Sequence, residues 1–216
     1  MNENAVSRAR QEASRGDYSS MARLARVLYE AGMAPREVIR ECYETELPEE
    51  FFLISEVGPY RLDWQFLFTN QPWQLAVPLS EGGPPPEPYL LLDRVERRIF
   101  GRDPGLIPLV RALNLDAYHG GLIICYHVDE LSVNCPITFG IPMEVGPDDE
   151  IERYDSSLLG VIHQHHSETL NLLIQRYNLS SNRGAGAVDW GEVEEAREAV
   201  AQIEELQLQV ESRNLE

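Results

Sequence analysis

The sequence predicts an α+β fold: a mixed or antiparallel sheet with helices packed on one side, N-terminal helices, and an appended acidic C-terminal helix. At both ends of the chain, apolar residues recur at helical spacing, whereas the middle carries short aromatic and β-branched runs separated by Gly, Pro and Asn. The length of 216 residues, with 43% hydrophobic residues, suffices for one core and an appended element. We expect about four to six strands.

The N-terminal part, residues 1–46, is predicted to be helical. Apolar side chains share one face of a helix over 18–31, and Gly32 suits the position just past its end. Pro35 suits the first turn of a second helix. A third, short helix begins near residue 47 with two glutamates in its first turn, where the helix dipole favours acids.

The middle of the chain is predicted to supply the sheet. The continuous apolar run 122–126 indicates a central strand, and 136–141 is its expected neighbour. Two aromatic runs, 64–68 and 73–77, are predicted as strands joined by a turn. The remaining assignments are a stiff proline-rich loop at 82–88, a short strand at 89–92, and a helix over 95–113 that breaks at 103–105.

The C-terminal part is predicted to be two helices joined by a linker of small residues. The first runs from Asp155 to about Tyr177. The second begins at Asp189, with Glu192 three positions later as a capping-box-like pair, and runs to about Ser212 with a narrow apolar seam. The predicted boundaries are 1–46 for the N-terminal helical segment, 47–178 for the α+β core, 179–187 for the linker and 188–216 for the acidic helix.

Charge and composition argue against several classes of function. All 18 basic residues are arginine, against 36 acidic residues, which gives a formal net charge of −18 and a pI near 4.6. Without lysine there is no Schiff-base or P-loop lysine chemistry, and we expect no nucleic-acid binding. The acidic surface favours capture of a basic protein instead. We expect no membrane span and no secretory signal, and three cysteines without CxxC spacing fit a cytoplasmic protein.

Two groups of residues could carry chemistry. His163 and His166 share a helix face at a spacing that zinc ligands use, with His165 pointing elsewhere, but His166 also fits a hydrogen-bonded core histidine. Cys125 and His127 would project from the same face of a strand, where the imidazole could activate the thiol; a buried cysteine beside a surface histidine is the simpler interpretation. We therefore predict no catalytic residues, no metal and no cofactor.

The acidic segment 144–155 is the predicted partner-binding surface. It holds six acids and one arginine and is interpreted as a charged surface loop. Like charges at this density repel one another and destabilise the folded chain, so a role in binding is a physical reason for their presence. The candidate contact residues are Glu144, Asp148, Asp149, Glu150 and Glu152.

Three segments together resemble the SUKH (Smi/Knr-like) superfamily of bacterial proteins. They are LPEEFFL at 47–53, GGLIIC at 120–125 and SSLLGVIHQHHSETL at 156–170. The resemblance covers residues 30–178; it departs from the family at 56–60, where the chain reads EVGPY instead of an Asn-Gly turn. It implies helices packed on a mixed sheet and a role as an immunity protein that neutralises a toxin, with no fixed catalytic set.

The predicted function is thus a non-enzymatic protein-binding module, most simply an immunity or antitoxin protein that occludes a basic toxin or effector domain. One alternative is a small metal- or thiol-dependent enzyme using His163 and His166 or Cys125 and His127. Another is a regulatory or assembly protein that acts through its C-terminal helix, for which residues 188–216 could form a homo-oligomer.

Overall fold

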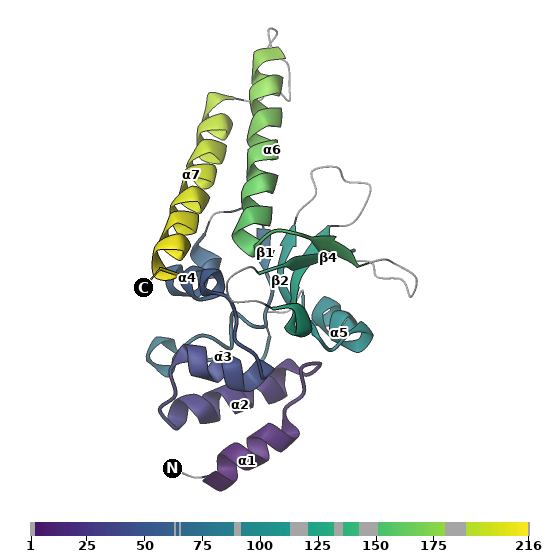
Figure 1. Cartoon of the computed structure of the whole chain (residues 1–216), viewed down its shortest axis with the longest axis vertical. Helices are drawn as coiled ribbons and strands as arrows, with labels where there is room; N and C mark the ends of the chain where they lie inside the picture. Colours follow the sequence, from purple (N-terminus) through teal and green to yellow (C-terminus); the bar gives the residue numbers. More distant parts are fainter. Residues whose placement is uncertain are drawn as a thin grey trace.

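The computed structural model describes most of the chain: residues 3–62, 64, 66–88, 92–112, 121–131, 136–142, 151–179 and 189–215. The helices are α1 (Glu3–Glu12), α2 (Tyr18–Glu30), α3 (Pro35–Tyr43), α4 (Glu49–Val57), α5 (Asp93–Arg102), α6 (Leu158–Leu179) and α7 (Trp190–Arg213). The strands are β1 (Phe66–Phe68), β2 (Leu106–Ala112), β3 (Leu122–His127), β4 (Thr138–Pro142) and β5 (Glu152–Tyr154). The predicted α+β fold is confirmed (Figure 1).

The five strands form one antiparallel sheet in sequence order, β1-β2-β3-β4-β5. β3 is the middle strand, as its continuous apolar run predicts, and β4 is its neighbour, with Cys125 opposite Phe139. Both edge strands are only three residues long. Short edges of this kind limit pairing with other chains.

The two faces of the sheet are covered by different helices. One face belongs to the main core, which includes Ile124 and Tyr126 of β3 together with side chains of α2, α3, α4, α6 and α7. The alternate residues of β3 point to the opposite face of the sheet. On that face, Ile123 and Cys125 pack against Val95 and Ile99 of α5. Most helices therefore lie on one face, but the expectation of helices on one side only is wrong, because α5 covers a smaller core on the opposite face.

The N-terminal helices form as their sequence pattern predicts. Tyr18, Met21, Ala25 and Leu28 of α2 are all at most 1% exposed. Gly32 has φ +90°, and its N–H donates to the Tyr29 carbonyl, so the chain leaves α2 through the left-handed region that glycine adopts without strain.

Two predicted assignments are wrong: the strand at 73–77 and the second half of the helix over 95–113. Residues 73–77 are turns, not a strand: the Gln74 N–H donates to the Asn70 carbonyl and the Ala76 N–H to the Pro72 carbonyl. The partner of β1 is β2, which lies within the stretch predicted as the second half of a helix over 95–113. A mostly apolar run such as 106–112, which holds one arginine, fits a buried strand as well as a buried helix, and pairing on both edges decides for the strand. The predicted strand at 89–92 falls mostly outside the described residues, and Leu92 precedes α5.

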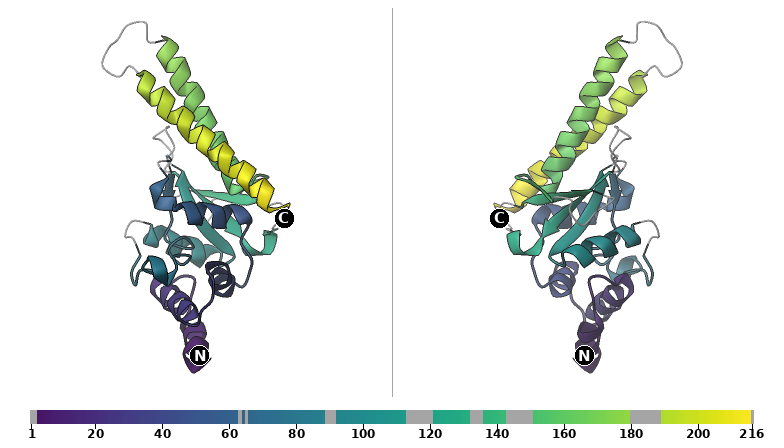
Figure 2. Two further views of the ribbon diagram at one scale, coloured as in Figure 1. Left: turned by 90° about the vertical axis from the view of Figure 1, so that its left-hand side faces the viewer. Right: turned by 90° about the vertical axis from the view of Figure 1, so that its right-hand side faces the viewer.

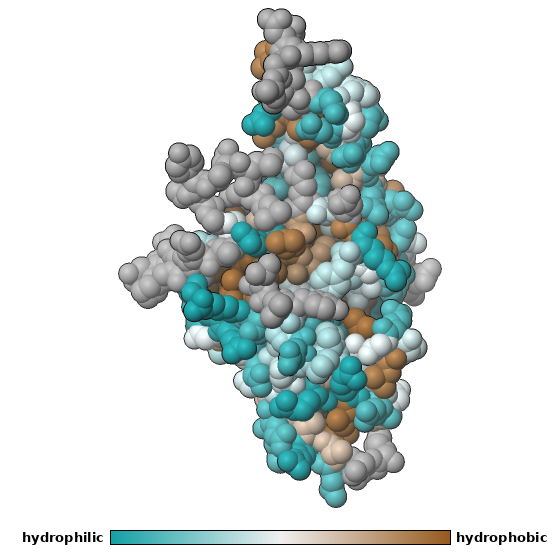
Figure 3. Space-filling model, turned by 180° about the vertical axis from the view of Figure 1, so that it is seen from behind, coloured by the Kyte–Doolittle hydropathy of each residue, from teal (hydrophilic) through white to brown (hydrophobic). Residues whose placement is uncertain are grey.

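α6 and α7 form a long antiparallel hairpin, the α6–α7 arm, that projects from the body on the side away from α1 (Figures 1 and 2). The end of α7 returns to α4, so the C-terminus lies at the base of the arm (Figure 1). Seen from behind, the described surface is mostly hydrophilic, with a hydrophobic area exposed at mid-height, near the level of the sheet (Figure 3). Within the described residues no helix has the length and apolarity needed to cross a membrane.

A cluster of buried polar side chains joins the sheet to α5. Thr69, Asn70, Gln71, Gln74 and Glu96 are each at most 2% exposed. The backbone N–H and side-chain amide of Asn70 donate to the Glu96 carboxylate at 2.5 and 3.1 Å, and the Gln74 amide donates to the Asn70 side chain at 2.9 Å. Glu96 Oε2 has no partner within the described part of the chain. Sequence reasoning did not find this cluster.

Candidate protein-binding site on the helical arm

The base of the arm is held by a buried carboxylate. Glu50, on α4, is 2% exposed and accepts hydrogen bonds from the backbone N–H groups of Leu158 and Leu159 at 2.9 and 3.0 Å. The Tyr126 hydroxyl of β3 donates to the same carboxylate at 2.5 Å. The first N–H groups of a helix lack partners within that helix, and a carboxylate there also interacts favourably with the helix dipole. Glu50 therefore fixes where α6 begins and in which direction it leaves the sheet.

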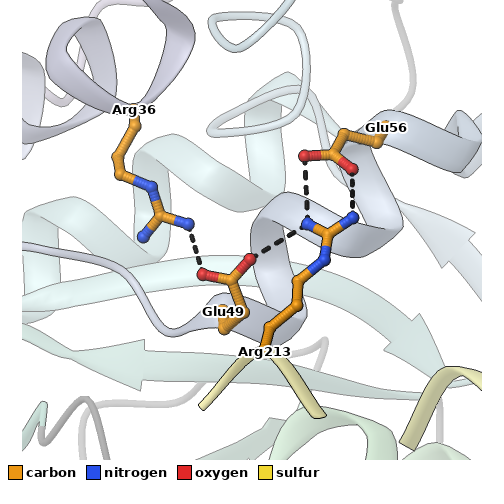
Figure 4. A network of polar contacts seen from close by, with 4 residues as sticks. All are labelled: Arg36, Glu49, Glu56 and Arg213. Atoms are coloured by element: carbon orange, nitrogen blue, oxygen red, sulfur yellow. Dashed lines mark hydrogen bonds and ion pairs between the residues drawn. The ribbon is translucent and has the colours of Figure 1, made fainter. Parts of the chain in front are cut away.

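The returning end of α7 is held by an ion-pair network on α4. Arg213 donates to Glu49 at 3.0 Å and to Glu56 at 2.8 and 3.2 Å (Figure 4). Arg36 pairs with the other oxygen of Glu49 (Figure 4). Its guanidinium also lies 4.0 Å from the centre of the Phe52 ring. Burial would raise the pKa of Glu49, but the hydrogen bonds from Arg36 and Arg213 outweigh it and hold that pKa below its usual value.

Packing between the two arm helices is dense at the base and sparser towards the tip, although Val193 near the start of α7 is fully buried. Ile203 and Leu206 of α7 belong to the main core, and Trp64 donates to Gln202 at 2.9 Å. On α6 the fully buried side chains end at Thr169. Beyond it the arm carries a large share of the exposed apolar side chains of the described chain, among them Leu172, Tyr177, Leu179 and Trp190.

A groove of about 700 Å³ lies along this more sparsely packed part of the arm and is called the arm groove below. Its apolar lining includes Leu172 and Leu173 of α6 and Ala196 and Ala199 of α7. Three glutamates of α7, at 192, 195 and 198, line it at intervals of three residues, and Arg176 lines it from α6. The arrangement provides apolar contact area beside a row of negative charge.

The predicted partner-binding acids are only partly described. Glu144, Asp148, Asp149 and Glu150 lie outside the described residues. Glu152, predicted to lie in a surface loop, begins the edge strand β5 instead, and its carboxylate accepts a hydrogen bond from the Tyr154 hydroxyl at 2.9 Å. Pairing with Thr138 to Gly140 of β4 places residues Glu152–Tyr154 in the sheet.

The three histidines do not all converge. His163 faces α7 and lies 3.3 Å from the Glu204 carboxylate. His166 is 3% exposed, contacts the Ile162 carbonyl at 3.1 Å and stacks on Phe66, as the core interpretation predicts. His165, predicted to point elsewhere, instead packs against Phe66 as His166 does, with 5.9 Å between the two imidazole centres. Burial lowers the pKa of both His165 and His166. In the part of the chain that the structure describes, no three His, Cys, Asp or Glu side chains gather as metal ligands would.

The Cys125 thiol is fully buried against α5 and contacts the Ile123 carbonyl. Burial raises the pKa of Cys125 well above its ordinary value, so the thiol is protonated at neutral pH. His127 instead lies 3.3 Å from Asp103 and accepts from the Asp129 N–H. Cys42 is also buried, with its pKa raised by burial to about 12.

The arm groove was missed by sequence reasoning, although part of its signal is visible. The acidity and the narrow apolar seam of 188–216 are visible in the sequence. Which apolar positions stay uncovered depends on how α7 pairs with α6, and that register is not contained in the pattern of either helix alone.

Comparison with known proteins gives no relative: no family model, no curated protein and no solved structure matches this chain.

Proposed function

We propose that this chain is a non-enzymatic protein-binding module that captures a basic protein through acidic surfaces, in the manner of a cytoplasmic immunity or antitoxin protein. The sequence argument is the net charge of −18 together with the resemblance to the SUKH superfamily. The observation that carries the proposal is the projecting arm, whose groove combines exposed apolar side chains with a row of glutamates. Protein interfaces of this kind obtain affinity from an apolar centre and association rate from charge.

Two acidic regions of the sequence are the proposed contacts for such a partner. One is α7, and the other is the segment that contains Glu144, Asp148, Asp149, Glu150 and Glu152. Charges at the rim of an interface act on the encounter rate, and their effect is screened at the ~8–10 Å Debye length of physiological salt.

The test uses the protein encoded by the neighbouring gene, the first candidate for a toxic effector. We expect stoichiometric addition of this chain to abolish the toxicity of that protein, with an association rate that falls steeply as salt rises and a dissociation rate that changes little. Replacing Asp148, Asp149, Glu150 and Glu152 by Arg should slow association at low salt. A neighbour that is neither bound nor neutralised contradicts the immunity role, and an association rate indifferent to salt contradicts capture by charge.

A further inference from the structure

We propose that the arm groove seats one amphipathic, basic α-helix of the partner, so that α6, α7 and the bound helix form a three-helix bundle. This inference rests on the proposed function and assigns the chemistry of the partner's contact segment. The first reason is shape. Two antiparallel helices leave an elongated furrow between them, and a third helix is the element that fills such a furrow through interdigitating side chains.

The length of the groove fits a helix of ordinary size. Its lining on α6 runs from His166 to Arg176, and on α7 from Glu192 to Gln202. At 1.5 Å per residue each stretch spans roughly 15 Å, nearly three helical turns. A partner helix would present apolar residues at i, i+3, i+4 and i+7 over this distance.

The apolar lining defines the face that the partner presents. Leu172 is 45% exposed and lines the groove from α6, and the small side chains Ala196 and Ala199 line it from α7. Small residues let a third helix approach closely, while Leu172 offers it a large apolar contact. Near the tip, Tyr177 and Trp190 contact each other at 5.2 Å between ring centres and remain about half exposed.

Charge decides between a foreign helix and a second copy of this chain. Three glutamates line the groove against one arginine, and residues 188–216 hold nine acids against two arginines. A second copy docked through the same arm would place acidic α7 beside acidic α7. Like charges at an interface oppose association, whereas Lys or Arg flanking the apolar face of the partner helix would meet Glu192, Glu195 and Glu198.

The experiment uses the full chain and a labelled 18-residue peptide of Leu, Ala and Lys with its leucines on one helical face. A scrambled isomer of the same composition spreads the leucines around the helix. We expect the amphipathic isomer to bind at least about tenfold more tightly than the scrambled isomer in fluorescence anisotropy, because only the former presents a continuous apolar face.

Two substitutions that add the same charge distinguish binding in the groove from general attraction to the acidic surface. Ala196→Arg fills the groove, whereas Ala201→Arg adds the same charge at an exposed position of α7 outside its lining. Ala196→Arg should weaken binding of the amphipathic peptide about tenfold, and Ala201→Arg should weaken it much less. Thermal melts will confirm that both variants fold. Leu172→Ser, at a half-exposed position, serves as a second groove variant.

Equal binding of the two peptide isomers, or equal weakening by the two arginine variants, would overturn the inference. The neighbouring-gene assay keeps the two proposals distinct. If that protein is neutralised and Ala196→Arg leaves neutralisation intact, the groove assignment fails while the proposed function stands.

Discussion

Replacing Glu96 by Gln should stabilise the protein at neutral and alkaline pH. Burial raises the pKa of Glu96 to about 7, and the hydrogen bonds from Asn70 and from the Gln71 backbone only partly offset that rise. Gln keeps an oxygen for the two Asn70 donors, and it removes the charge that burial penalises. Its amide nitrogen replaces Oε2, the atom that has no partner among the described residues.

The magnitude follows from the change in pKa. The ordinary value is 4.5, so the unfolded chain loses the Glu96 proton near pH 4.5 and the folded chain keeps it until about pH 7. Between these values the free energy of unfolding falls as pH rises, and above pH 7 the loss is complete. A displacement from 4.5 to about 7 corresponds to about 3 kcal/mol. For a chain of this size, that is a rise in Tm of roughly 6–12 °C for the Gln variant at pH 8.

Urea unfolding of both proteins from pH 4.5 to 8.5 measures the effect. The two curves should coincide near pH 4.5 and separate progressively up to pH 7. Glu87→Gln, at an exposed position, is the matched control and should track the parent protein throughout. A Gln variant that is less stable at pH 8, or a difference that does not change with pH, would refute the reasoning.

Three further predictions concern the arm. Glu50→Gln should cost about 2–3 kcal/mol in urea unfolding, because one acceptor oxygen is left for three buried donors; an unchanged midpoint would contradict its anchoring role. Arg213→Ala should cost about 1 kcal/mol at pH 7. Since the pKa of Glu49 is lowered, that contribution is present above pH 4.5 and lost below it, so parent and variant should converge in acid melts. Ending the chain at residue 184 removes Ile203 and Leu206 from the core and should abolish cooperative melting; a sharp melt of the shortened chain would show that α7 is dispensable for folding.

The sequence pattern predicts an element best where the residues of the element itself determine its structure. The run 122–126 is central because a strand buried on both faces is apolar throughout, and Asp189 starts α7 because its side chain accepts from the Glu192 N–H at 3.0 Å. The run 106–112 is also mostly apolar, with Arg111 as its one charged residue, yet its strand state depends on pairing with β1 and β3, which lie outside the run itself. The local sequence pattern therefore predicts the central strand β3 correctly and misassigns β2 as part of a helix.

The candidate site is harder to predict than the fold. Among 36 acids, nothing local distinguishes the buried Glu96 from exposed ones. Glu50 carries one weak signal, because α4 is apolar on most of its surface and leaves an acid little room to face water. The acidic segment near Glu152 was expected as a loop because charge suggests solvent, but an edge strand with one solvated side accommodates charge as well.

The two attachments at the base of the arm have a consequence for binding thermodynamics. With α6 fixed by Glu50, the end of α7 fixed by Arg213 and Val193 of α7 buried nearer the tip, the groove is present before any partner arrives. A preorganised surface loses little conformational entropy on binding, so more of the contact energy appears as affinity. Association then resembles rigid docking, with the ordering cost borne by the incoming segment alone.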